Sequence, residues 1–81
     1  MISCDIHDYI EIACTFGYAI TLTMKSGKVI KGKALDTQLD TNRKECILIK
    51  NDQKECLVVL DELASMKAST ENPHFNLVSF N

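Results

Sequence analysis

The chain has 81 residues, of which 46% are hydrophobic and 25% are charged, and its formal net charge is −2. This composition is typical of a globular protein and excludes a disordered chain, and the length suits one domain over 1–81. No apolar run approaches the roughly 20 residues that a membrane-spanning helix needs, and the N-terminus lacks the pattern of a secretory signal. We therefore expect a cytoplasmic protein without membrane association.

The first predicted element is an amphipathic helix over about 5–16. Its apolar residues fall within one broad arc at ~100° per residue. They are Ile6, Tyr9, Ile10, Ala13, Cys14 and Phe16. Asp5 is the expected N-cap, and Gly17 suits the left-handed position that ends many helices.

Three acidic residues, Asp5, Asp8 and Glu11, share the opposite side of this helix. Carboxylates in a first turn favour the helix dipole by ~0.3–1 kcal/mol each, which explains Asp5 and Asp8 as solvated capping residues. Glu11 lies beyond the first turn and has no Lys or Arg three or four positions away. Two interpretations are therefore open, a solvated face or a docking surface for a basic partner. Tyr9, at the border of the apolar arc, is either a core-edge aromatic or a stacking contact.

Two alternating runs over 19–35 predict an antiparallel hairpin that turns at Ser26-Gly27. Gly32, inside the second run, predicts a sharp bend or a close approach of two backbones. Four lysines surround this hairpin, namely Lys25, Lys28, Lys31 and Lys33. They either discourage association between strand edges or form a direct RNA-binding surface. Few aromatic residues accompany them for base stacking, so direct nucleic-acid binding is the less favoured interpretation.

The rest of the chain predicts more strands. The elements are, in order, a polar loop (36–44), a strand (45–50), a turn (51–53), a strand (54–60) and a short strand (63–68). Both faces of the runs over 45–50 and 54–60 are apolar, so we expect these two strands to be buried on both sides. The tail, 69–81, forms either a sixth strand or a cover. The chain thus predicts a mainly β fold with one N-terminal helix, a small antiparallel barrel of five or six strands over about 19–68.

Neither metal binding nor catalysis is indicated. The four cysteines contain no C-x-x-C pair, so we expect reduced thiols that fill the core as small hydrophobic residues, with no metal and no cofactor. They are Cys4, Cys14, Cys46 and Cys56. His7 and His74 lack the neighbours of a nucleophile or a phosphate loop, so we do not expect an enzyme.

The order of elements resembles the Sm-like fold, which has a short helix, a hairpin with a turn such as Ser26-Gly27 and a glycine at a position like Gly32. Sm-like proteins use a ring of subunits to bind RNA. The Arg-Gly or similar pair that holds the nucleotide in their fourth strand is replaced here by residues 58–61, VVLD.

A more specific motif is CD-x-x-D-x-x-E-x-AC, which begins at Cys4 and ends at Cys14. With the strand around Leu22 and the late pair Leu60-Asp61, it resembles the bacterial Rho-binding antiterminator family, Rof, over roughly residues 2–67. The resemblance implies a small Sm-like barrel that binds the termination factor Rho near its RNA-loading surface and so inhibits termination. An acidic helix suits such a target, because a surface that loads RNA must be basic.

On this interpretation the protein is a monomer when free, and its helix docks on Rho. The partner-binding residues are Asp5, Asp8, Tyr9 and Glu11, and the four hairpin lysines make secondary contacts. The alternative is an Sm-like RNA-binding protein that uses those lysines.

Overall fold

The computed structural model describes residues 4–52 and 54–80. Its elements are α1 (Cys4–Phe16), β1 (Ala19–Met24), β2 (Val29–Leu39), β3 (Glu45–Asn51), β4 (Lys54–Val59), a 3₁₀ turn η1 (Leu60–Glu62), β5 (Leu63–Ala68) and β6 (Leu77–Ser79). The six strands form one antiparallel sheet in the order β4-β3-β2-β1-β5-β6. The predicted mainly β fold with one N-terminal helix is confirmed, and the tail supplies the sixth strand.

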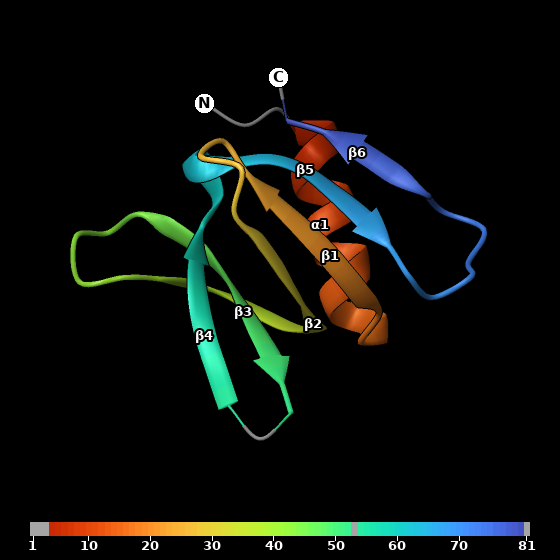
Figure 1. Cartoon of the computed structure of the whole chain (residues 1–81), viewed down its shortest axis with the longest axis horizontal. Coiled ribbons are helices and arrows are strands. Elements are labelled where there is room, and N and C mark those ends of the chain that lie inside the picture. The colour runs from red at the N-terminus through yellow and green to blue at the C-terminus, as the bar shows by residue number, and fades with distance from the viewer. Residues whose placement is uncertain (1–3, 53, 81) are drawn as a thin grey trace.

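The sheet is strongly curled, and α1 lies behind β1 and β5 in the view of Figure 1. Within the described residues, β4 and β6 each pair with one neighbour and not with each other, so the hydrogen-bonded ladder stays open. No helix of this part of the chain is long and apolar enough to cross a membrane.

The helix begins one residue earlier than predicted. Asp5 therefore lies inside the first turn of α1, and its assignment as the N-cap is wrong. There its carboxylate acts on the helix dipole instead. The predicted end is confirmed, since Gly17 has φ +63° and the Tyr18 N–H donates to the Ala13 carbonyl at 2.9 Å. This pattern is a Schellman motif, which fixes the direction in which the chain enters β1.

The turn between β1 and β2 spans one residue more than the predicted Ser26-Gly27 pair. The Met24 N–H donates to the Lys28 carbonyl at 2.7 Å, and the Gly27 N–H donates to the Met24 carbonyl at 2.9 Å. Gly27 has φ +94°. A three-residue loop with glycine in the left-handed position gives the twist that antiparallel strands need.

The predicted polar loop over 36–44 is wrong in its first half, because β2 continues to Leu39. Residues 36–39 pair with β3, so hydrogen bonding to a neighbouring strand overrides their polar composition. The bend expected at Gly32 lies instead near Leu35, where the register shifts between Ala34 and Asp36. Gly32 marks a close approach of two backbones, since a Cβ atom there would lie 2.6 Å from the Lys50 carbonyl oxygen.

The core lies between α1 and the inner face of the sheet. The helix contributes the buried Ile10 and Ala13, and β1 contributes Ile20 and Leu22. Phe75, just before β6, is also buried against this cluster. The tail therefore completes the core and is not a loose end.

Burial on both sides is confirmed for β3 and wrong for β4. In β3 the neighbours Cys46 and Ile47 are both fully buried. In β4 residues 54–57 are exposed, because this strand forms the edge of the sheet and extends past the core. Gln53, in the predicted turn over 51–53, lies outside the described residues.

The cysteines do not all fill the core as predicted. Cys46 is buried and Cys14 is half-buried, whereas Cys56 is exposed on the edge strand. All three are free thiols. The side chain of Cys4 lies outside the described structure.

Candidate functional site

The carboxylates of Asp5, Asp8 and Glu11 are all exposed on α1. Within residues 4–52 and 54–80, none of them has a basic side chain within ion-pairing distance. The one contact at salt-bridge distance found there joins His7 Nε2 to Glu45 Oε2 at 3.0 Å and ties α1 to β3, as an ion pair when His7 is protonated. The predicted acidic side of the helix is therefore present and has no intramolecular partner in this part of the chain.

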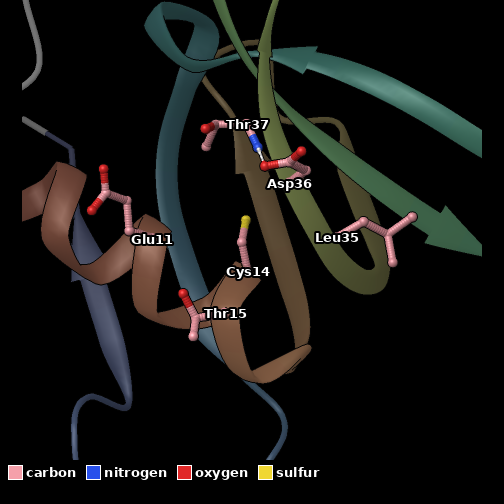
Figure 2. A pocket seen from close by; sticks show the side chains of 6 residues that line it. All are labelled: Glu11, Cys14, Thr15, Leu35, Asp36 and Thr37. Atoms are coloured by element: carbon pink, nitrogen blue, oxygen red, sulfur yellow. Dashed lines mark hydrogen bonds between the residues drawn. The ribbon is translucent and has the colours of Figure 1, made fainter.

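The structure adds a fourth carboxylate, Asp36 on β2, to this surface. A hollow of about 300 Å³ separates Glu11, Cys14 and Thr15 of α1 from Leu35, Asp36 and Thr37 of β2. Figure 2 shows the Cys14 thiol pointing from the helix into the hollow, with Asp36 on the opposite side. We define the acidic face as Asp5, Asp8, Glu11 and Asp36.

A second hollow of about 370 Å³ lies alongside the first. Its lining consists of Asp8, Glu11, Ile12, Thr15 and Phe16. Because Glu11 and Thr15 line both hollows, the two follow α1 side by side. A partner can thus place side chains on either side of Glu11.

The negative charges of this face affect the pKa of the half-buried Cys14 thiol. Burial raises the pKa of Cys14, and the charges of Asp36 and Glu11 raise it further, to about 11. The thiol is therefore neutral near pH 7, and it lacks the electropositive setting of a reactive cysteine. Carboxylates from two elements, α1 and β2, thus both raise the pKa of this thiol.

Sequence reasoning missed Asp36 because it fell in the predicted loop. The bulge at Leu35 and the pairing of Asp36 with Leu48 bring it to the helix. Asp36 Oδ1 accepts a hydrogen bond from the Thr37 N–H at 2.8 Å, which orients the carboxylate. No local pattern in the sequence indicates that bulge.

Tyr9 is half-buried, and its ring lies 5.5 Å from that of Phe75, tilted by 60°. The core-edge role weighed for Tyr9 is thus present, and part of the side chain stays accessible. Phe16 lies at the end of α1, 60% exposed, and it stacks on His74 at 5.7 Å. Aromatic contacts therefore hold the helix against the tail.

The four predicted lysines divide into two groups. Lys25 and Lys28 flank the turn, whereas Lys31 and Lys33 lie on the outward side of β2, and all four are exposed. The Lys33 stem passes close to the end of α1, since a Cβ atom on Gly17 would lie 2.7 Å from Lys33 Cε. The structure does not bring these lysines into the acidic face.

The site is thus an exposed, negatively charged surface on a helix that packs against a small antiparallel sheet. A family profile described as "Modulator of Rho-dependent transcription termination (ROF)" matches residues 1–80. The chain belongs to this family, as its sequence motif predicted. The family is a regulatory one, which agrees with the expected absence of catalysis.

Among solved structures, the chain is similar to one described as YaeO bound to Magnesium from Vibrio cholerae O395. The two share 44% sequence identity and superpose with a TM-score of 0.88, over 91% of this chain and 96% of that one. No curated protein is significantly similar to this chain. The likeness to YaeO confirms the small mainly β fold.

Proposed function

We propose that this protein inhibits Rho by placing its acidic face on the surface where Rho loads RNA. The observation that supports the proposal is the set of exposed carboxylates at Asp5, Asp8 and Glu11, none with a basic neighbour in the described chain. A surface that binds RNA carries Lys and Arg side chains for the phosphates. Carboxylates can form charge-assisted hydrogen bonds with the same side chains, so inhibitor and RNA would compete.

The construction of the acidic face favours binding. Because the carboxylates lack internal ion pairs in the described residues, no such pair has to break before they meet a basic partner. Ile10 and Ala13 anchor the opposite side of α1 in the core, so the helix is already ordered in the free protein. Little conformational entropy then has to be lost on docking.

Tyr9 supplies an apolar contact at the margin of this interface. Its ring is held by Phe75, so its accessible part keeps a fixed orientation. A fixed aromatic ring beside carboxylates suits a surface that otherwise stacks a base.

The test is the double variant Asp8→Lys with Glu11→Lys. Each charge-assisted contact contributes ~1.5–3 kcal/mol, so losing two should weaken Rho binding by roughly 100-fold or more. Titration calorimetry with purified Rho measures this effect, and circular dichroism checks that the helix persists. Native affinity in the double variant would show that α1 is not the docking face.

A matched control carries the same change of charge elsewhere. Asp61 and Glu62 are exposed on η1, so Asp61→Lys with Glu62→Lys should bind Rho within about threefold of the native protein. An equal loss in both variants would mean that net charge, and not the acidic face, governs binding.

Competition supplies an independent test of the mechanism. Pyrimidine-rich RNA should displace the protein from Rho in a pull-down, because both use the same basic side chains. A stable complex that contains the protein, Rho and RNA bound at the loading surface would contradict the proposal.

A further inference from the structure

The register of the sheet gathers a second charged surface. Lys33 of β2 lies directly opposite Lys50 of β3, and Lys31 lies opposite Thr21 of β1. Thr21 in turn lies opposite Lys67 of β5. Residues that face each other across antiparallel strands project to the same side, as do residues two apart on one strand. We call Lys31, Lys33, Lys50 and Lys67 the lysine face.

This face is turned away from the core, and of its lysines Lys33 runs beside the end of α1. The alternate residues of β1, Ile20 and Leu22, are buried on the inner side with Ile10 of the helix. The four lysines are exposed, and along their strands they alternate with residues that face inward, such as Ala34, Ile49 and Met66. The acidic face and the lysine face are therefore separate surfaces.

Protection of strand edges does not explain these lysines. Exposed lysines discourage unwanted pairing when they lie on an edge strand. Here the four lysines belong to β2, β3 and β5, each of which pairs with a strand on both sides. Lys33 has a structural role as well, since its stem runs beside the end of α1, where a cation is favoured. Lys50 lies directly opposite Glu55 of β4, a favourable pair of opposite charges, whereas Lys31 and Lys67 have no such explanation.

The arrangement is unfavourable for the isolated protein. Like charges placed directly opposite each other, as Lys33 and Lys50 are, destabilise a sheet. Within the described chain, none of the four lysines forms an ion pair, although Glu55 of β4 lies opposite Lys50 and offsets part of this repulsion. A bound polyanion would remove this repulsion.

We propose that the lysine face binds the phosphate backbone of single-stranded nucleic acid, independently of sequence. Each lysine offers a point charge to a phosphate, and the hydroxyls of Thr21, Thr23 and Ser65 lie among them as further donors. The face carries no aromatic side chain, so it has no means of reading bases.

An acidic protein surface is the less favoured occupant. Protein interfaces depend on apolar or aromatic residues at their centre. The centre of the lysine face is Thr21, and the exposed apolar residues Val29 and Leu77 lie at its margins, opposite Thr23 and Lys67. Evenly distributed charge without an apolar centre is suited to a phosphate backbone.

Fluorescence anisotropy of a labelled oligouridine strand with the protein alone tests the proposal. Four lysine contacts predict a slope of about −3 for log affinity against log salt, or roughly a 50-fold loss between 50 and 200 mM salt. Lys31→Gln, Lys50→Gln and Lys67→Gln together should reduce the slope to about −0.7 and weaken binding at least ~10-fold at the lower salt. Absence of salt-dependent binding by the native protein overturns the proposal.

The matched control is Lys25→Gln, Lys28→Gln and Lys44→Gln, which removes the same charge from exposed positions outside the face. It should bind the strand within about threefold of the native protein. A loss equal to that of the first triple variant overturns the proposal. Tighter binding of poly-L-glutamate than of oligouridine at equal charge also overturns the proposal, because it would identify the face as a site for acidic proteins. Because Rho is absent from these experiments, their outcome is independent of the function proposed above.

Discussion

The acidic face and the lysine face carry opposite charges, and they are built differently. Three of the four acids belong to α1, whose position depends on Ile10 and Ala13 in the core. The four lysines belong to three strands, and their proximity depends on the register of the whole sheet. A net charge of −2 thus hides two strongly charged surfaces. Substitutions on α1 can change the acidic face without moving the sheet, whereas the lysine face is lost if the register of the strands changes.

The largest expected effect comes from reversing charge on the helix. Asp8→Lys with Glu11→Lys should weaken binding to Rho by roughly 100-fold or more. Oligouridine binding should stay equal or become stronger, because the lysine face is intact and the net charge becomes more positive. Parallel anisotropy titrations with Rho and with the oligonucleotide measure both effects. If the two affinities fall together, the two faces are not separate surfaces.

A substitution in the sheet should act on stability instead. In Gly32→Ala the new Cβ would meet the Lys50 carbonyl oxygen at 2.6 Å, and backbone cannot move aside cheaply. We expect the free energy of unfolding to fall by about 2 kcal/mol, measured by urea denaturation.

Gly27→Ala is the control for that experiment. Its Cβ would lie in open space, so only the strain of φ +94° remains, a cost of about 1 kcal/mol. If Gly32→Ala costs no more than Gly27→Ala, the close approach of β2 and β3 is not tight.

The smallest effect concerns the thiol in the acidic face. The pKa of Cys14 is raised to about 11, first by burial and then by the charges of Asp36 and Glu11. Asp36→Asn removes one negative charge, so the pKa should fall and a larger fraction should be thiolate at pH 8. Alkylation of Cys14, followed by mass spectrometry, should then be severalfold faster. Lys67→Gln, on the other face, should leave the rate unchanged, and an unaltered rate in Asp36→Asn would mean that Asp36 does not act on Cys14.

The sequence predicts which residues share a charged face only when those residues lie close together along the chain. Asp5, Asp8 and Glu11 recur at helical spacing, so the sequence alone indicates their common side. Asp36 joins them only through the bulge at Leu35, which no local pattern predicts.

For the same reason, only two of the four residues of the lysine face can be predicted from the sequence to lie together. Lys31 and Lys33 are two apart on one predicted strand, whereas Lys50 and Lys67 come from strands whose partners only the structure gives. The apolar run of β4 predicts a buried strand, but β4 is exposed, because composition does not reveal which strand lies at the edge of a sheet.

The short strand β6 limits how copies of this protein can join through their sheets. By pairing with β5 it occupies one side of that strand, and with three residues it offers very little backbone of its own to a neighbour. Among the strands of residues 4–52 and 54–80, β4 is the other edge strand, and it presents a longer unpaired side. Growth of rings or filaments by strand addition requires two different free sides on every subunit. A protein with one such side can pair its β4 with the β4 of a second copy. That dimer then has no long unpaired strand to which a third copy could add.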